Sequence, residues 1–475
     1  YWSPTKQLIV DNNGLNSVPA ILPDGSYLFN LIRLTRYGHL SAGTNVTLAF
    51  GTQLEHFTGD NTATLKMSGA FQSSVITVGG GAIVDVDGQI PITSSVTISN
   101  TATLILRAGL GTSTFDSLTV NNGGVVNLFP KNNGNSDYTD DAPFELNLST
   151  LTIANGGTLN ANGLGYASSR TGDGMGPGGT LIGNPGHGGA LTGSAYGSVT
   201  QPISLGSAGA YGYATQPGGS GGGAIKLMVT GNAVLNGTLS ANGANGALNF
   251  GGSGGGGTGG SIWIQAGNLS GAGLIQANGG SYANGINNAA GGRIALYYTT
   301  STFTGSVQSF GAAPGTVYWG ALNKLVVDNN NTNAASASIV SGANQFDQIS
   351  LTRYGHLTVE ANATITLAND ALTGDETAKL TINGILNAPA LTVKKNVLVE
   401  LAGQTTTNTN LTVDSTATLI IRGTGSPYTF NSLTVNPSGI VSLVPKILGG
   451  TDYTGDKPVE INVNTLTVEA GGIIT

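Results

Sequence analysis

The feature that most constrains this chain is a long internal repeat. The heptapeptide "LTRYGHL" occurs at Leu34–Leu40 and again at Leu351–Leu357. The pair Tyr1-Trp2 likewise returns as Tyr318-Trp319. Both recurrences are separated by 317 positions (351 − 34 and 318 − 1). A period this long predicts large structural units arranged in tandem.

The repeat also places the boundaries of the units. "TATLILR" at Thr101 matches "TATLIIR" at Thr416, an offset of 315, which indicates a two-residue deletion in the second copy. We expect a first unit at residues 1–317 and a second unit at residues 318–475 that contains only the first half. Because the second copy ends in mid-unit, we expect a segment of a longer array.

Each unit contains two kinds of sequence pattern, a strand-rich half and a glycine-rich half. Residues 1–160 alternate apolar and polar positions between Gly/Asn turns, as in "SLTVNNGGVVNL", which predicts strands with one buried face. Residues 161–317 place glycine tracts before strands, as in "GGSGGGAIKLMV". Such short, regularly spaced strands predict an all-β fold, namely a parallel β-helix (β-solenoid) with glycine-rich loops. We expect a right-handed winding, because crossover connections between parallel strands are right-handed. Tandem β-sandwich domains are the alternative.

Composition excludes several classes of function. Charged residues are 9% of the 475 and the net charge is −7, so we expect no basic surface that would bind nucleic acid. The chain has no cysteine, which rules out disulfides, thiolate metal sites and cysteine nucleophiles. No apolar run approaches the roughly 18 residues that span a bilayer, so we expect no membrane insertion.

The glycine-rich half carries a resemblance. "GGSIWIQAGNLSGAGLIQANGG", at residues 259–280, is followed by "GGRIALYY" at residues 291–298. These stretches resemble parts of very large, repetitive, secreted bacterial surface proteins that are adhesin-like or filament-forming and have β-helix architecture. The resemblance implies an extracellular or cell-surface location and a structural or adhesive role. It brings no catalytic residues with it.

A pair of carboxylates on one strand is a candidate for catalysis. Asp85 and Asp87 in "VDVDG" would share a strand face, a layout suited to acid/base chemistry or calcium in a polysaccharide-cleaving β-helix. In the second copy Asp85 becomes Glu400, but Asp87 becomes Ala402. An obligatory pair would keep both members, so we favour ordinary polar positions and expect no enzymatic activity.

Two histidines and the glycine tracts have no partners that would make a site. His56 follows Glu55, and His187 lies in a glycine-rich loop, and neither has a second ligand at metal spacing. We expect both histidines to be exposed. The glycine tracts precede strands, whereas a phosphate-binding loop must follow a strand and open a helix, so we expect a structural role.

An acidic loop is a candidate for binding calcium, the one cofactor that the sequence suggests. Hard oxygen ligands on a turn suit calcium, and the acids of "NNGNSDYTDDAPFE" recur in the second copy. The alternative is a polar loop in which aspartates cap turns. The candidate ligands are Asp137, Asp141, Asp452 and Asp456.

The duplicated heptapeptide is expected to be structural. As one alternating strand it would turn Leu34, Arg36, Gly38 and Leu40 largely inward, with Gly38 making room for a large neighbour. The Arg36 stem would reach from this face towards a corner of the coil or a subunit contact. Its other face would then be free for contacts between units. Acids recur in both copies only outside the motif, as with Asp11 and Asp60. The candidate inter-unit contact residues are Arg36, Tyr37, His39, Arg353, Tyr354 and His356.

Three functions follow from these observations. We expect a rod-like segment of a cell-surface filament, sheath or fibre that self-associates end to end, because a solenoid's end coil exposes an unpaired edge. The alternative is an adhesin stalk that binds carbohydrate by stacking loop aromatics on sugar rings, with Tyr196, Tyr211 and Tyr213 as candidates. A polysaccharide-degrading β-helix enzyme comes third.

Overall fold

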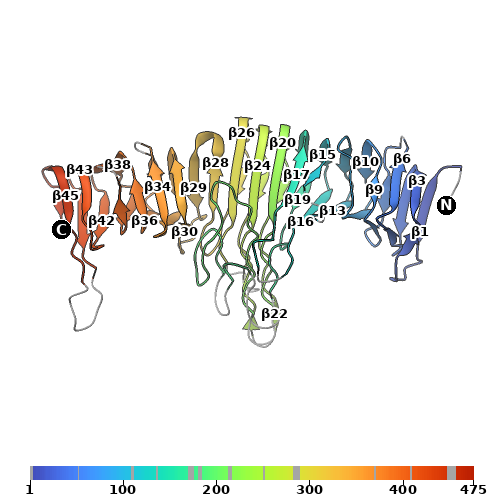
Figure 1. Cartoon of the computed structure of the whole chain (residues 1–475), viewed down its shortest axis with the longest axis horizontal. Helices are drawn as coiled ribbons and strands as arrows, with labels where there is room; N and C mark the ends of the chain where they lie inside the picture. Colours follow the sequence, from blue (N-terminus) through green and yellow to red (C-terminus); the bar gives the residue numbers. More distant parts are fainter. Residues whose placement is uncertain are drawn as a thin grey trace.

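The computed structural model is an elongated all-β protein, as the sequence predicts (Figure 1). Within the described residues the only helical element is the 3-10 helix η1 (Gly320–Leu322). All strand pairs there are parallel except β22–β23 and β28–β29, so these strands do not form the antiparallel sheets that the β-sandwich alternative requires. The described residues are 4–51, 53–108, 112–134, 137–168, 176–179, 185–211, 217–249, 252–281, 289–368, 371–406, 409–446 and 456–475.

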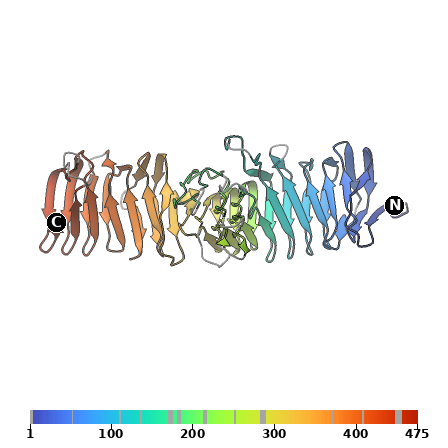
Figure 2. The ribbon, with the colours of Figure 1, turned by 90° about the horizontal axis from the view of Figure 1, so that it is seen from below.

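Strands from successive turns of the chain lie side by side along the molecular axis (Figure 2). The longest sheet has sixteen strands and runs through both units. Its main path is β1 (Gln7–Asp11), β4 (Leu31–Thr35), β7 (Phe57–Gly59), β10 (Val75–Val78), β12 (Ser95–Ile98), β15 (Ser117–Val120), β18 (Thr150–Ile153), β20 (Ala224–Leu235), β24 (Ser261–Ser270), β26 (Arg293–Ser301), β28 (Thr316–Trp319), β29 (Lys324–Asp328), β32 (Gln348–Thr352) and β35 (Leu372–Gly374). Off this path lie β14 (Ser113–Thr114) and β17 (Phe144–Leu148).

Further sheets form the other walls of the first unit. The second wall is β2 (Ala20–Leu22), β5 (Leu40–Ala42), β8 (Thr64–Met67), β11 (Ile83–Val86), β13 (Thr103–Arg107), β16 (Val125–Phe129), β19 (Thr158–Asn160), β21 (Thr238–Ser240), β25 (Leu274–Gln276) and β27 (Ser306–Gln308). A short third wall is β3 (Gly25–Phe29), β6 (Val46–Phe50) and β9 (Ala70–Phe71). A hairpin in the glycine-rich half pairs β22 (Leu248–Asn249) with β23 (Gly252–Ser253).

The second unit repeats this plan. One wall is β30 (Ala337–Ile339), β33 (His356–Val359), β36 (Ala378–Ile382), β39 (Val397–Leu401), β42 (Thr418–Arg422), β44 (Ile440–Val444) and β46 (Ile473–Ile474). Another is β31 (Gly342–Phe346), β34 (Ala363–Leu367), β37 (Ile385–Asn387) and β40 (Gln404–Thr405). A third is β38 (Ala390–Val393), β41 (Thr409–Val413), β43 (Tyr428–Val435) and β45 (Ile461–Val468).

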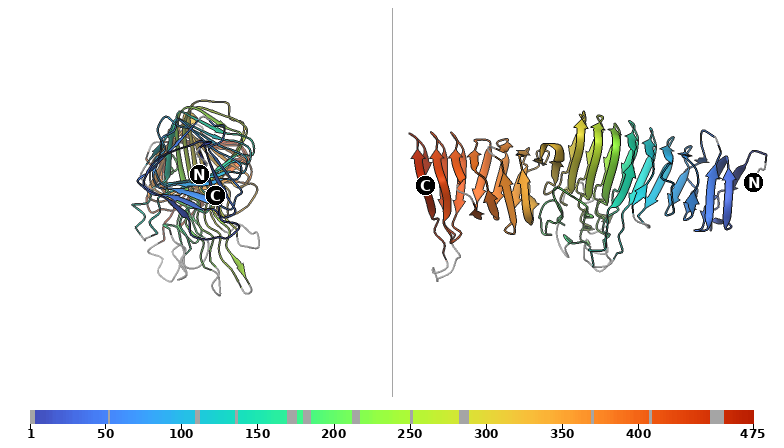
Figure 3. Two further views of the ribbon diagram at one scale, coloured as in Figure 1. Left: turned by 90° about the vertical axis from the view of Figure 1, so that its right-hand side faces the viewer. Right: turned by 45° about the horizontal axis from the view of Figure 1, so that its top comes forward.

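The core consists of apolar columns that run along the axis. Alternate residues of each strand point inward, and in-register parallel pairing sets like side chains above one another. Seen end-on, the turns superpose around a common interior (Figure 3). One column in the second wall contains, in order, Leu40, Leu65, Val84, Leu104, Val126, Leu159, Leu239, Ile275 and Val307.

The two units meet where the strand direction reverses. β28 leads through η1 into β29, which pairs with it antiparallel so that Tyr318 lies opposite Leu325. Val317 lies in the core of the first unit, whereas Tyr318 and Leu325, on the other face of the same sheet, lie in the core of the second. Strand direction and buried face are therefore both inverted at this pair. The chain still advances along one axis (Figure 1). Two inversions leave the hand of the winding unchanged.

The glycine-rich segments form a close-packed layer below β20, β24 and β26 (Figure 1). The residue immediately before each strand from β20 to β28 in the main sheet is glycine: Gly223, Gly260, Gly292 and Gly315. A Cβ on Gly260, Gly292 or Gly315 would lie 1.9 Å from the carbonyl oxygen of the glycine one turn earlier. Backbone contact at this distance admits no side chain, which is why the tracts precede the strands.

This packing predicts the effect of a single methyl group. Gly292→Ala places its Cβ against the carbonyl of Gly260, so we expect it to destabilise the protein by about 2 kcal/mol, the usual cost of overpacking. The matched control is Gly43→Ala, because no atom lies within 4 Å of that position, and we expect a change below about 0.5 kcal/mol. Denaturant unfolding followed by circular dichroism measures both. Equal effects of the two substitutions would contradict the close-packed layer.

Candidate functional site

The duplicated heptapeptide forms a corner between two strands. β4 ends at Thr35, and Arg36 and Tyr37 both have left-handed backbones, with φ of 49° and 61°. The prediction of one continuous strand is therefore wrong. Leu34 is buried at the end of β4 as expected, but the chain must turn before β5 can return along the next wall. The second copy repeats the geometry, with φ of 50° at Arg353 and 61° at Tyr354.

Gly38 is required by the backbone of the preceding turn. A Cβ at this position would lie 2.2 Å from the carbonyl oxygen of Val10. In the second copy a Cβ on Gly355 would lie 2.0 Å from the carbonyl oxygen of Val327. The expected large neighbour of Gly38 is thus a main-chain carbonyl and not a side chain.

Stacking brings two distant carboxylates onto the Arg36 corner. The Arg36 guanidinium lies 2.7 Å from Asp11 in the turn before, and its backbone N–H donates to Asp60 in the turn after, at 2.7 Å. The Arg36 hydrogen bond lowers the pKa of Asp11. Burial would raise the pKa of Asp60, but hydrogen bonds from Thr62 and Arg36 outweigh it and the pKa is lowered.

The second copy has the same arrangement and adds a contact to the first unit. Arg353 lies 2.7 Å from Asp328, and its backbone N–H donates to Asp375. Its guanidinium also lies 5.8 Å from the ring centre of Phe310, a residue of the first unit. The Arg36 contacts described above lie within its own unit, and a role of Arg36, Tyr37 and His39 between units stays a prediction.

The neighbouring tyrosine and histidine complete the corner in both copies. The Tyr37 N–H donates to the Thr62 hydroxyl, and the Thr64 N–H donates to Nδ1 of His39. In the second copy the Tyr354 N–H donates to the Thr377 hydroxyl, and Nε2 of His356 lies 3.1 Å from the Thr377 carbonyl. These bonds join successive turns, so the corner fixes the register of the stack.

The Asp85 carboxylate is held by an arginine. Both oxygens of Asp85 accept from Arg107, at 2.8 and 2.9 Å. The equivalent carboxylate, Glu400, is bound by Arg422 and Lys379. Burial of Glu400 would raise its pKa, but these two cations lower it. The element that recurs is an ion pair between turns and not a pair of carboxylates.

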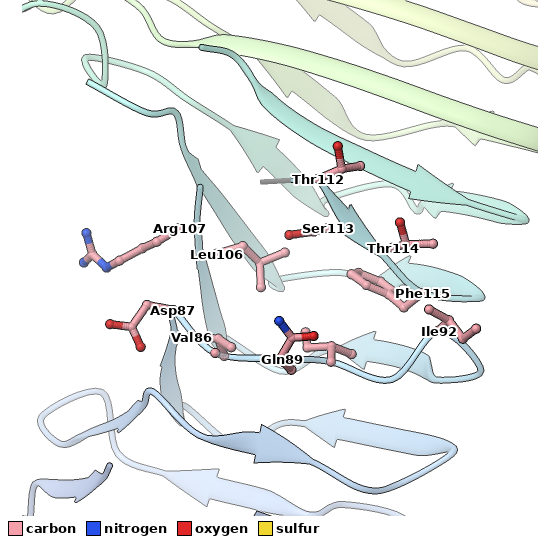
Figure 4. A pocket seen from close by; sticks show the side chains of 12 residues that line it. Val86, Asp87, Gln89, Ile92, Leu106, Arg107, Thr112, Ser113, Thr114 and Phe115 are labelled. Atoms are coloured by element: carbon pink, nitrogen blue, oxygen red, sulfur yellow. The ribbon is translucent and has the colours of Figure 1, made fainter. Parts of the chain in front are cut away.

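Asp87 lies at one end of a hollow beside this ion pair (Figure 4). The hollow is where the third wall stops, since the last bridge to β9 joins Ala70 to Gln89. Arg107 lies beside Asp87, whereas Ile92 and Phe115 close the opposite end. One Asp87 oxygen is buried without a hydrogen-bond partner. The remaining lining residues are Val86, Gly88, Gln89, Ile90, Leu106, Thr112, Ser113 and Thr114.

The expectation that His56 and His187 are exposed is wrong. His56 is 1% exposed and bonds across turns, accepting from the Thr77 N–H at 3.1 Å. His187 is 0% exposed, and its Nδ1 lies 2.7 Å from the Gly259 carbonyl. Both rings fill spaces between backbones that a sequence cannot show to be adjacent. His187 belongs to a buried polar cluster that also contains Arg293.

Arg293 is the centre of that cluster and is 0% exposed. Its guanidinium donates to the carbonyls of Tyr196 at 2.8 Å and Ser338 at 2.9 Å. Longer bonds reach the Thr316 hydroxyl at 3.3 Å and the His187 carbonyl at 3.4 Å. Burial lowers the Arg293 pKa to about 10, so the group stays charged at neutral pH.

Arg293 joins three parts of the chain at the boundary between the units. It belongs to β26, Tyr196 lies in the glycine-rich half, and Ser338 lies in β30 of the second unit. Its acceptors are neutral oxygens, so removal of the arginine would leave buried carbonyls without donors. The cluster is sealed from solvent and has the chemistry of a structural clamp.

The sequence contains a signal for Arg293 that pattern reading missed. The strand openings "GGAIKL", "GGSIWI" and "GGRIAL" place Ala224, Ser261 and Arg293 at one position, and these residues stack in register. A single large cation in a column of small residues after a glycine pair marks a buried, specifically bonded group. Only the folded chain shows that its acceptors come from segments up to 106 residues away.

Two carboxylates of the acidic loop accept hydrogen bonds from other residues of the same loop. Asp137 accepts from the N–H and hydroxyl of Thr139, and Asp141 accepts from the Asn133 N–H at 3.1 Å. No group of three or more potential metal ligands occurs within the described residues, to which Asp456 belongs and Asp452 does not. Calcium binding at this loop stays a prediction.

The structure describes two of the three loop tyrosines that were candidates for carbohydrate binding. The Tyr196 hydroxyl donates to the Leu205 carbonyl at 2.7 Å, and its ring lies 4.6 Å from that of His187. Burial raises the Tyr196 pKa. Tyr211 is half-buried, and Tyr213 lies outside the described residues.

In the part of the chain that the structure describes, no helix is long and apolar enough to cross a bilayer.

The clamp predicts the cost of losing Arg293. Arg293→Met keeps much of the side-chain volume but leaves the carbonyls of Tyr196 and Ser338 unpaired, so we expect a loss of about 3 kcal/mol. Arg33→Met is the control, because Arg33 is exposed on β4 and should change stability by less than about 0.5 kcal/mol. Chemical denaturation measures both. An Arg293→Met variant as stable as the parent would show that Arg293 is not a clamp.

The burial of His187 predicts a pH dependence. Burial, with repulsion from Arg293, lowers the His187 pKa from 6.5 to about 3. Between these values the unfolded chain binds a proton that the folded chain does not, so stability falls as pH drops below about 6.5. The slope from one such group approaches about 1.4 kcal/mol per pH unit.

The test compares unfolding between pH 6.5 and pH 4.5, above the range in which aspartates titrate. His187→Asn retains a donor for the Gly259 carbonyl and removes the titrating ring. We expect the variant to show a shallower loss of stability on acidification, because the contribution of His187 is removed while that of His56, whose pKa burial also lowers, remains. An unchanged slope would show that His187 does not titrate as its burial requires.

Comparisons with protein-family models, with curated proteins and with solved structures found no match. The function proposed below therefore depends on the described contacts.

Proposed function

We propose that the chain is a stiff, rod-like segment of an extracellular filament, sheath or fibre, built from right-handed β-solenoid units. The observation that carries the proposal is the junction between the units. One sheet passes through it without interruption, and its two faces serve the cores of the two units in turn. Units joined in this way share backbone hydrogen bonds and have no flexible linker between them.

The junction is reinforced on the side of the glycine-rich layer. Arg293 bonds to Ser338, the Ser338 N–H donates to the Gly188 carbonyl, and Gly189 forms an antiparallel bridge with Ala337. Bending at the boundary would break these buried bonds, each of which costs about 1–3 kcal/mol when left unmade. Resistance to bending is the property that a fibre segment requires.

The outer surface supports the same proposal. Charged residues are 9% of the chain, and several form pairs between turns, such as Asp11–Arg36 and Asp85–Arg107. Asparagines also bond along the axis, as Asn160 does to Asn127 at 2.8 Å. These polar contacts connect each turn to the next and favour mechanical continuity over the presentation of a reactive group.

The other two functions gain less support. The Tyr196 ring packs against that of His187 and its hydroxyl donates to a main-chain carbonyl, so this residue is not a free stacking surface for the adhesin proposal. A polysaccharide-cleaving activity would need a free carboxylate pair, and Asp85 is bound by Arg107. Neither function draws on a specific contact in the described residues.

Two measurements test the proposal. Small-angle X-ray scattering and negative-stain images of the purified chain should show straight, unbranched rods with no bend at the unit boundary. Immunogold labelling of intact producing cells, with permeabilised cells as the control, should place the label on external fibres or sheaths. Compact or freely bent particles, or label found only after permeabilisation, would overturn the proposal.

A further inference from the structure

The first turns of the two units are equivalent in detail. β1 pairs with β4 so that Leu8 lies opposite Ile32, and β29 pairs with β32 so that Leu325 lies opposite Ile349. The Asp11–Arg36 pair of the first unit corresponds to Asp328–Arg353 of the second. The surroundings of the second unit's first turn therefore show what the same surface of the first unit can accept.

The two turns differ in what lies beyond them. β29 has β28 as an antiparallel neighbour, and its inward residues Leu325 and Val327 are 0% exposed. Among the described residues β1 pairs with β4 and no other strand, and the equivalent residues Leu8 and Val10 are partly exposed. β1 thus presents an open strand edge above an incompletely covered core.

Apolar side chains gather on the same face of the first unit. Leu15, Val18 and Ile21 are 68%, 87% and 79% exposed. The counterpart of Ile21 is Ser338, which is 1% exposed beneath the glycine-rich half of the first unit. Ile21 thus stands exposed where its counterpart is covered by the preceding unit, and exposed apolar side chains of this kind mark an interaction site. The counterparts of Leu15 and Val18 are less covered, since Thr332 is exposed and Ala335 is half-buried.

A polar group on this face is also positioned for a partner. Asn329 donates from its side-chain amide to the Thr332 carbonyl, and its amide oxygen accepts from the Gly311 N–H of the preceding unit. The equivalent Asn12 makes the same donation, to the Leu15 carbonyl. Its side-chain oxygen has no counterpart of Gly311 beside it within the described residues. The acceptor is therefore preformed for a main-chain donor.

We propose that β1 and residues 12–22, together termed the N-terminal face, dock the glycine-rich end of another unit of the same design. The incoming unit ends in a segment equivalent to residues 316–317 of β28, which pairs antiparallel with β1 as Val317 does with Val326, and it offers a main-chain N–H to Asn12. Of the counterparts of the exposed apolar residues on this face, Ser338 is buried by the preceding unit, Ala335 is half-buried and Thr332 is exposed, so docking covers Ile21 most completely. This proposal rests on the proposed fibre function and specifies how its units join.

The absence of cysteine from the chain allows a site-specific test. Single substitutions Ile21→Cys and Ser338→Cys in the chain of residues 1–475 calibrate alkylation by a maleimide. The first should react rapidly and the second roughly tenfold or more slowly, because the two positions are 79% and 1% exposed. Circular dichroism and unfolding midpoints confirm that each variant is folded.

The decisive protein is a tandem chain in which residues 1–317 precede residues 1–475, so that Val317 is followed by Tyr1. Ile21→Cys in its internal copy should react as slowly as Ser338→Cys, whereas Ile21→Cys in its leading copy should stay fast. Val18→Cys, from a position 87% exposed, repeats the comparison if the first substitution disturbs the junction. Equal rates for internal and leading copies at both positions would overturn the docking proposal.

This result is independent of the fibre function itself. Scattering from the chain of residues 1–475 tests whether it is a straight rod, and alkylation of the tandem chain tests whether its N-terminal face accepts a unit. A straight rod with equal alkylation rates would retain the fibre and reject this mode of joining. A bent or compact particle would reject the fibre whatever the alkylation rates.

Discussion

Parallel hydrogen bonding between successive turns of the chain is the constraint on which the rest of the structure depends. Each strand bonds to the strand at the same position in the next turn, so residues of one kind must recur at one position. Leu40, Leu65 and Val84 are successive members of one such column. A polar residue in the column would be buried without a partner, which is why strands of the first half alternate so regularly.

The junction shows how the stack of turns continues when the buried face of the main sheet changes from one side to the other. An antiparallel pair, β28 with β29, reverses the chain and moves the core to the other face of the sheet. At this boundary the buried main-chain carbonyls of Tyr196 and Ser338 need hydrogen-bond donors. Arg293 supplies them from one side chain, which explains why a charge is tolerated at a position that is 0% exposed.

Glycine has two separate functions in this chain. In the second half it lets backbones approach so closely that a methyl group at Gly292 would meet the carbonyl of Gly260. At the corner, the absence of a Cβ on Gly38 lets the chain pack against the carbonyl of Val10. The preceding residues Arg36 and Tyr37 adopt the left-handed backbone that turns the chain. The second function is local and recurs with the heptapeptide, whereas the first depends on the stacking of turns.

The sequence by itself determined the all-β class, the inward positions of the strands and the period of the repeat, because each is a local pattern or a direct recurrence. It could not determine that LTRYGHL is a corner, since alternation of Leu34 and Leu40 fits a strand equally well. Nor could it show that His56 and His187 are buried, or that Asp11 and Asp60 meet at Arg36, because turn lengths vary and stacking sets these distances. Only the tertiary structure decided that Arg293, one residue after a glycine pair, joins two units, because its acceptors come from segments that are distant in the chain and adjacent only after the strand reversal at β28 and β29.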